Sequence, residues 1–234
     1  MKKIFLVGIV AVGALTMTAC KKKGCTDNTA TNYNSKAKKD DGTCLYVPTI
    51  QIIGATDTTI SVGNTYTDPG ATAKNRDESV VEVTATNNVN DGSTGVYTVD
   101  YSATNDNGIA TAQRTVRVAI RQDSYIKTWN VTSNCGTTQF PLAGGPTITA
   151  GNQPNSLVFD GMFTLLGGTA NATVNGANIV FPEQTVPVTG GEIVFSGTGV
   201  MVPTGNIINV SYTYNNTIPL VGGSGTCTAT YTKQ

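Results

Sequence analysis

The sequence predicts an all-β protein of two domains, an N-terminal β-sandwich over residues 49–121 and a C-terminal antiparallel up-and-down β-barrel over residues 122–234. Apolar and polar residues alternate along most of both segments, which is the period of a half-buried strand. Clusters of glycine, asparagine and aspartate separate the alternating stretches. The composition, with 26 glycines and 13% charged residues, is poor in helix formers. A second β-sandwich is the alternative for the C-terminal domain.

The first residues have the layout of a secretory signal. Two lysines precede an apolar run over residues 4–15, which is too short to span a membrane comfortably, and Ala19 stands directly before Cys20. This segment resembles the signal of bacterial lipoproteins, although Met17 stands where that family usually has leucine. The resemblance implies that residues 1–19 are removed and that Cys20 is acylated, for example with palmitate. Ordinary secretory cleavage is the alternative.

A lipid on Cys20 would make the protein a lipoprotein of the cell envelope, anchored to the outer membrane on its periplasmic face or at the cell surface. Residues 20–48 would then form the anchor and a tether. Removal of residues 1–19 leaves 13 basic and 15 acidic residues. No nucleic-acid partner is expected from that balance, so the membrane is the partner that the sequence itself implies.

The other four cysteines predict two disulfides in an oxidising compartment, Cys25 with Cys44 and Cys135 with Cys227. A metal site is the competing interpretation of these thiols. The chain has no histidine and no CxxC spacing, so neither zinc nor any other cofactor is expected.

The segment GCTDNTATNYNSKAKKDDGTCLY, residues 24–46, resembles a short Cys-bounded motif that recurs near the start of exported bacterial proteins and implies no function. A loop of this size cannot bury a core, and a Cys25–Cys44 bond would stabilise it by about 3 kcal/mol. Its oxygen-bearing side chains could bind calcium. Asx turns capping a disulfide loop are the simpler interpretation, because lysines interrupt the cluster and the EF-hand spacing is missing. The residues concerned are Asp27, Asn32, Asn34, Asp40 and Asp41.

Two strands joined by a turn at residues 105–108 are predicted to close the first domain. On the first strand one face carries Tyr97, Val99, Tyr101 and Ala103, and on the second it carries Val116, Val118 and Ile120. The segments VGNTYTDPGATA (62–73), GVYTVDYSATNDNG (95–108) and TVRV (115–118) resemble bacterial immunoglobulin-like modules related to hyalin repeats. The resemblance implies a β-sandwich that serves as a spacer or adhesive unit. Valine stands at position 99, where immunoglobulin domains have cysteine, so packing alone must hold the two sheets.

About eight strands are predicted after residue 122, with Asn175-Gly176 as the type I′ turn of the clearest hairpin. A Cys135–Cys227 bond would join both ends of the domain and stabilise it by about 4 to 5 kcal/mol. The domain resembles compact calycin-like or lipocalin-like barrels. Trp129 lies on the first predicted strand, as in lipocalins, but their Gly-x-Trp motif is not kept because Lys127 takes the place of glycine.

No enzymatic activity is expected. Without histidine, catalytic triads of the Ser-His-Asp and Cys-His types cannot form. A carboxylate pair for glycoside hydrolysis would have to come from the four acidic residues of the C-terminal domain, which suit turns and outer strand faces. They are Asp123, Asp160, Glu183 and Glu192.

Two functions follow from these features. In the first, the immunoglobulin-like module presents the C-terminal domain to a glycan or protein ligand, with Trp129, Tyr212 and Tyr214 as candidate stacking residues, although their phase also suits a core. In the second, the barrel carries a small apolar ligand or inhibits a secreted enzyme. A carrier would have a central cavity lined by Phe159, Phe181, Phe195 and Tyr212.

Overall fold

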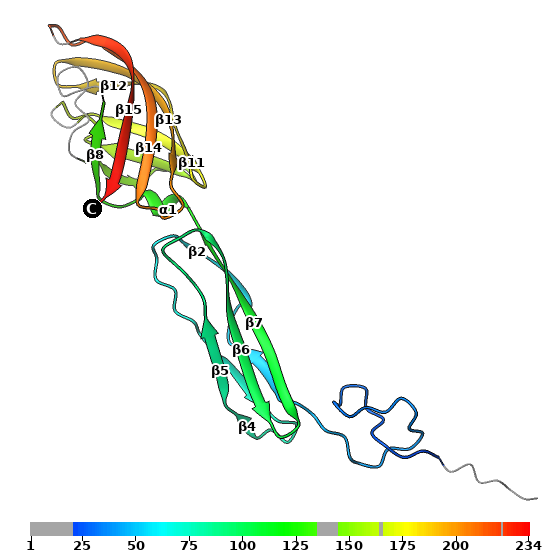
Figure 1. Cartoon of the computed structure of the whole chain (residues 1–234). Coiled ribbons are helices and arrows are strands. Elements are labelled where there is room, and N and C mark those ends of the chain that lie inside the picture. Colours follow the sequence, from blue (N-terminus) through cyan, green and yellow to red (C-terminus); the bar gives the residue numbers. More distant parts are fainter. Residues whose placement is uncertain (1–20, 135–144, 164–165, 221) are drawn as a thin grey trace, which may run out of the picture.

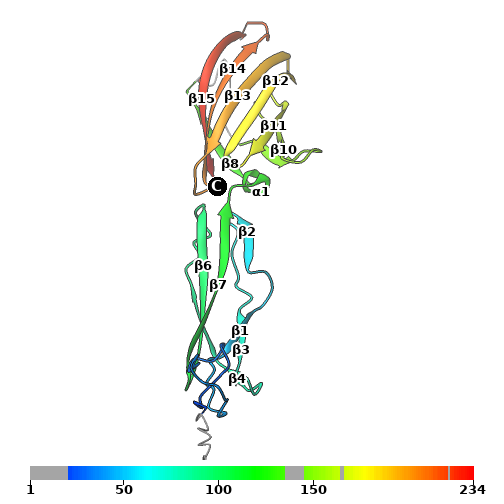
Figure 2. The ribbon, with the colours of Figure 1, turned by 90° about the vertical axis from the view of Figure 1, so that its right-hand side faces the viewer.

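A computed structural model describes residues 21–134, 145–163, 166–220 and 222–234. A Cys-bounded loop, a β-sandwich and a curled β-sheet follow one another along an elongated molecule (Figures 1 and 2). The predicted signal, Cys20 with its predicted lipid, and Cys135 all lie outside the described residues. Within the described ranges, no helix has the length and apolar character needed to cross a membrane.

The sandwich consists of two sheets. The first is formed by β1 (Thr49–Ile52), β3 (Ala71–Lys74) and β4 (Val80–Val81) in that order. The second has the order β2 (Asp57–Ser61), β7 (Gly108–Ala119), β6 (Gly95–Asn105) and β5 (Val83–Asn87). Strands β6 and β7 form the predicted hairpin, with Asn105 opposite Gly108, while β2 runs parallel to β7.

The small core of this module forms on the predicted faces of β6 and β7. Val99, Tyr101 and Val116 are buried between the sheets. The hydroxyl of Tyr97 donates a hydrogen bond to the carbonyl of Ser93 at 2.9 Å, which matches the tyrosine corner of immunoglobulin-like domains. Val99 is fully buried in the position of the usual cysteine, so apolar packing replaces the inter-sheet disulfide.

A buried arginine completes this core. Arg114 shares the inward phase of Val116 on β7 and is only 2% exposed. Its guanidinium lies 3.1 Å from the Asp68 carboxylate and donates to the Tyr101 hydroxyl. It also donates to the backbone carbonyls of Ile53, Ala55 and Gly70. One side chain therefore links the β7 strand to the loops around β1 and before β3.

In the described residues the C-terminal domain is one antiparallel sheet of eight strands, curled into a half-barrel, so the all-β prediction with a barrel-like second domain is confirmed. It begins after the one-turn helix α1 (Gln122–Tyr125). The strands lie in the order β8 (Trp129–Ser133), β15 (Gly223–Lys233), β14 (Ile207–Asn216), β13 (Gly191–Met201), β12 (Asn178–Val188), β11 (Thr169–Asn175), β10 (Ser156–Asp160) and β9 (Thr147–Ala150). Apart from β8, sequential strands are neighbours, which is the up-and-down pattern.

The β11–β12 hairpin differs from its predicted turn by one residue. Asn175 pairs with Asn178, so the two loop residues are Gly176 and Ala177. Gly176 has a φ of 56°, and Ala177 is not among the residues with positive φ. A positive φ at the first loop position alone is typical of a type II′ turn, which takes glycine there. The predicted type I′ turn at Asn175-Gly176 is therefore wrong.

Candidate functional site

The three aromatic residues predicted to stack on a ligand lie in the interior of the half-barrel. Trp129, Tyr212 and Tyr214 are 0%, 2% and 6% exposed. The Trp129 indole donates to the carbonyl of Tyr125 at 2.9 Å, and the Tyr212 hydroxyl shares a 2.6 Å hydrogen bond with Ser133. Burial raises the pKa of Tyr212 to about 12. The prediction of exposed stacking residues is therefore wrong, because the alternation of β8 and β14 turns these rings toward the core.

The same rings occupy the space in which a carrier would hold its ligand. Phe195 lies at the centre of a group of packed rings: its centroid is 5.3 Å from Phe181 and 5.8 Å from Phe163 in edge-on contacts, and 5.6 Å from the tilted ring of Tyr212. Phe159 packs against Phe181 at 4.9 Å. All five side chains are at most 2% exposed. The described core is thus filled by aromatic packing at the place where the carrier interpretation expects a cavity.

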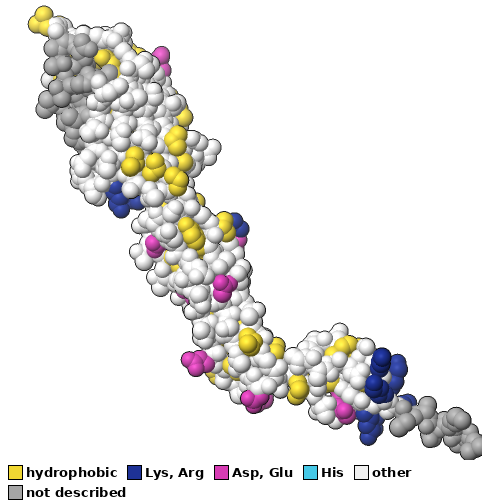
Figure 3. All heavy atoms as spheres, in the orientation of Figure 1, with side chains coloured by type: hydrophobic (Ala, Val, Ile, Leu, Met, Phe, Trp, Pro, Cys, Tyr) yellow, Lys and Arg dark blue, Asp and Glu magenta, His cyan; other side chains and the backbone are white. Residues whose placement is uncertain are grey.

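The outer face of the sheet has a hollow of about 710 Å³ over strands β12 to β15, which we call the outer hollow. None of its lining residues is charged. Two exposed aliphatic side chains, Val180 and Val200, lie in it. Its polar side chains come from all four strands and are Asn178, Thr198, Asn209, Ser211, Thr228 and Thr230. In Figure 3 the visible surface of this domain has few charged side chains and a hydrophobic patch near the junction with the sandwich.

Two glycines on β13 allow the strands beneath the outer hollow to approach closely. Gly197 and Gly199 alternate with the outward residue Thr198 and face the interior. A Cβ atom at Gly199 would lie 2.6 Å from the backbone oxygen of Asn209, and one at Gly197 would lie 2.8 Å from the Cβ of Tyr212. Glycine within a strand often marks such close backbone approach.

The acidic residues of this domain occupy separate places. Asp123 lies at the junction between the domains, and Asp160 ends β10, where it accepts a hydrogen bond from Thr169 at 3.2 Å. Glu183 is exposed on β12 and Glu192 on β13. In the part of the chain that the structure describes, no group of three or more His, Cys, Asp or Glu residues could hold a metal ion.

The junction between the two domains is built from polar and apolar contacts. The Ser61 hydroxyl donates to the Asp123 carboxylate at 2.5 Å. The backbone N–H of Thr94 donates to the carbonyl of Pro203 at 3.0 Å. Val62, next to Ser61, is fully buried and belongs to the core cluster of the C-terminal domain. These contacts join β2 and the loop before β6 to the base of the half-barrel.

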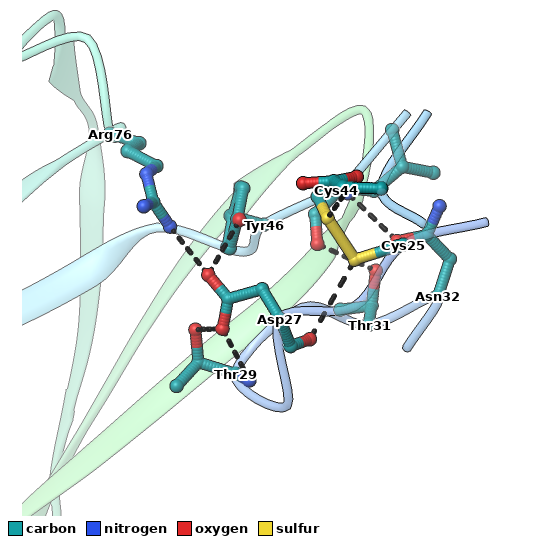
Figure 4. Close-up of polar contacts among 10 residues, drawn as sticks. Cys25, Asp27, Thr29, Thr31, Asn32, Cys44, Tyr46 and Arg76 are labelled. Atoms are coloured by element: carbon teal, nitrogen blue, oxygen red, sulfur yellow. Dashed lines mark hydrogen bonds and ion pairs between the residues drawn. A yellow bond between two sulfur atoms is a disulfide. The ribbon is translucent and has the colours of Figure 1, made fainter. Parts of the chain in front are cut away.

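At the opposite end of the sandwich, the Cys-bounded loop is closed by the predicted Cys25–Cys44 disulfide. Asp27 connects this loop to the sandwich: its carboxylate accepts hydrogen bonds from Tyr46 at 2.8 Å and Arg76 at 3.2 Å (Figure 4). Hydrogen bonds from Thr29, followed by those from Tyr46 and Arg76, hold the pKa of Asp27 well below its usual range. The guanidinium of Arg76 also lies over the Tyr46 ring, 4.1 Å from its centroid.

The oxygen atoms considered for calcium form turns inside this loop. Asp27, Asn34, Asp40 and Asp41 each accept a backbone N–H from the residue two positions later. Asn32 accepts the backbone N–H of Leu45. The first four are Asx-type contacts, and the Asn32 contact joins the middle of the loop to its C-terminal end, so all five side chains already accept a hydrogen bond from the chain itself.

We expect the Cys25→Ser/Cys44→Ser double variant to open the loop. In the chain-entropy model, loss of the disulfide lowers the stability of the closed loop by about 3 kcal/mol. When protease cleavage follows local opening, this corresponds to a cleavage rate about 100-fold higher. Limited trypsin digestion tests this, because Lys36, Lys38 and Lys39 lie inside the loop. Cleavage in the two domains serves as the internal control and should not change. Equal cleavage rates in the loops of both proteins would contradict the prediction.

The second predicted disulfide involves a cysteine outside the described part of the chain. Cys227 is buried in β15, opposite Tyr212 on β14. Its predicted partner Cys135 follows β8 and lies outside the described residues. The Cys135–Cys227 pairing therefore stays a prediction.

The sandwich is similar to a known family of domains. Residues 50–118 match the family described as bacterial surface protein, Ig-like domain. No match was found among curated proteins. Among solved structures, the chain is similar to a lipoprotein of Bacteroides thetaiotaomicron, with 16% identity, 80% of this chain and 100% of that chain covered, and a TM-score of 0.31. It is also similar to the CBM51-2 and INT domains of ZmpB from Clostridium perfringens, with 13% identity, 78% and 43% of the two chains covered, and a TM-score of 0.25. The calycin-like character of the C-terminal domain stays a prediction.

Proposed function

We propose that this chain is a lipid-anchored, exported binding or adhesion protein without enzymatic activity. Its immunoglobulin-like module acts as a spacer that presents the C-terminal domain to a glycan or protein ligand. The lipid on Cys20 would anchor it in the outer membrane, and the membrane would be its first partner.

The linear arrangement of the three parts is the observation that supports this proposal most directly. The Cys-bounded loop of the predicted tether lies at one end of the molecule and the C-terminal domain at the other (Figure 2). Contacts at both ends of the sandwich, Arg76 with Asp27 and Ser61 with Asp123, join it to its neighbours. A chain anchored through the tether would therefore hold its C-terminal domain away from the bilayer.

Two further observations support a binding role. The family matched by residues 50–118 is described as a surface protein of bacteria, which agrees with a location in the cell envelope. The packed rings around Phe195 favour contact through the outer surface over storage of a ligand inside the domain. The interpretation as an apolar-ligand carrier accordingly has no support from the described core.

The proposal can be tested in cells that express the full chain or its Cys20→Ser variant. The unaltered chain should incorporate an alkynyl palmitate analogue, fractionate with the outer membrane and retain the cells on beads coated with polysaccharide or matrix protein. The variant should lose labelling, membrane association and cell retention, while the purified variant still binds the beads. An unlabelled, freely soluble wild-type chain would overturn the anchoring. Purified protein that binds none of the coated beads would overturn the binding role.

A further inference from the structure

We propose that the outer hollow is a binding site for an uncharged polysaccharide. This inference rests on the proposed binding function and assigns its ligand class and its place on the fold. It moves the site from the inward aromatic residues predicted from the sequence to the outward residues of strands β12 to β15.

Four of the six polar side chains of the outer hollow are available to a ligand. In the described part of the chain, the side chains of Asn178, Thr198, Ser211 and Thr228 form no hydrogen bond with another residue. Hydroxyl and amide groups both donate and accept hydrogen bonds, as sugar hydroxyls do. Within the hollow Thr230 donates to Asn209 at 3.4 Å, and further along the same face Ser196 and Thr213 bond to each other at 2.9 Å, so these four side chains are the ones open to a ligand.

The sheet arranges these groups as a regular array. Neighbouring strands lie about 4.8 Å apart, and successive outward residues of one strand lie about 7 Å apart. Ser211 pairs directly with Thr198 on β13 and Thr228 on β15, so three hydroxyls form a row across the strands. A repeating chain of sugars presents a similar series of hydroxyl groups along its length.

Two aliphatic residues supply the apolar part of the site. Val180 is 43% exposed and Val200 is 51% exposed, although valine usually buries its side chain. They lie on neighbouring strands and line the same hollow as the row of hydroxyls. Such a surface can pack against the C–H groups of a sugar ring while the adjacent hydroxyls bind its oxygens.

The absence of charge in the lining selects the class of ligand. Acidic polysaccharides and nucleic acids would require lysine or arginine at the site, and the lining has neither. Protein interfaces depend on aromatic residues and arginine for most of their binding energy, and these are also missing from the lining. A neutral glycan is the ligand class that requires only the groups present here.

Native affinity electrophoresis of the purified chain tests the site, with gels containing soluble starch, arabinoxylan, galactomannan or the acidic polysaccharide pectin. At least one neutral polymer should retard the wild-type protein, and pectin should not. Ser211→Glu places a charge in the centre of the hollow and should weaken binding by about tenfold or more, because a charged group must lose water without gaining a partner. Val200→Ala, which adds no charge, should weaken it by about threefold through lost apolar contact.

The matched control is Thr185→Glu, which adds the same charge to an exposed position of β12 outside the hollow. It should bind like the wild type, and Trp129 fluorescence should show that all three variants are folded. Equal binding by Ser211→Glu and wild type would overturn the site and leave the binding function intact. Retardation by pectin alone would overturn the neutral ligand class. No retardation in any gel would overturn the glycan proposal, while binding to matrix-protein beads would still support the general function.

Discussion

Replacement of Arg114 by methionine is expected to lower the free energy of unfolding of the immunoglobulin-like module by about 3 to 5 kcal/mol. The substitution keeps much of the apolar volume of the side chain and removes the guanidinium. Asp68, whose side chain is 15% exposed, would then lose its ion-pair partner. Three backbone carbonyls, of Ile53, Ala55 and Gly70, would lose a donor. Part-buried acceptors that lose their donor and a carboxylate that loses its counter-charge both lower the stability of the fold.

The single tryptophan lies in the other domain, so its fluorescence does not report on this module. Hydrogen exchange measured by mass spectrometry on the full chain would give the change in free energy of unfolding for the module alone. Amides of β6 and β7 should exchange at least about 100-fold faster in the variant, since 1.4 kcal/mol corresponds to a factor of ten. Arg117→Met is the matched control. Arg117 lies on the same strand, and its pair with Asp57 is about half exposed on both sides, so its loss should cost at most about 1 kcal/mol. Equal effects of the two substitutions would contradict the structural role of Arg114.

The effect of Arg114→Met should also depend on pH. Burial alone would raise the pKa of Asp68, but hydrogen bonds from Tyr101 and the backbone of Gly70, together with the Arg114 charge, lower it below its ordinary value. A carboxylate with a lowered pKa in the folded state stabilises the protein above its unfolded pKa, near 3.9, and loses this contribution as the pH falls through the folded value. The difference between wild type and variant should therefore be largest near neutral pH and shrink below about pH 4.

Alternation of residue types was sufficient to predict the β-sheets. In both domains an inward residue at every second position produced the faces that the structure buries, for example Val99 on β6 and Val116 on β7. The up-and-down order of the C-terminal domain followed from its closely spaced turns. Local signals of this kind are set by neighbours in the sequence, which is why they can be interpreted without a structure.

Contacts between distant residues could not be predicted in this way. Arg114 has the phase of a core residue, but its partner Asp68 is 46 positions away and no local pattern joins them. The position of Trp129 in the alternating pattern was compatible both with burial and with exposure to a ligand. Only the curvature of the sheet decides which face becomes the core, and it buries Trp129. The outer hollow was missed because it contains threonine, serine and asparagine, which are ordinary residues on a wet strand face. Two exposed valines, Val180 and Val200, were the one available signal.

Replacement of Phe195 by alanine is expected to destabilise the C-terminal domain by about 3 to 5 kcal/mol. The ring is 1% exposed, packs edge-on against Phe163 and Phe181, and makes a tilted contact with Tyr212. Its removal would take apolar area out of contact and leave a cavity that the surrounding rings can fill only in part, since each is itself fully packed. The loss should therefore exceed that of an isolated surface side chain several-fold.

Urea unfolding followed by the fluorescence of Trp129 measures this domain selectively, because Trp129 is the only tryptophan and is fully buried. The midpoint of the Phe195→Ala variant should fall while the slope of the transition stays the same. Val200→Ala on the same strand is the control, because its side chain is exposed and its loss should change the stability by about 0.5 kcal/mol or less. If Phe195→Ala were as stable as this control, the interior around residue 195 would have spare volume, and storage of an apolar ligand there would again be a reasonable interpretation.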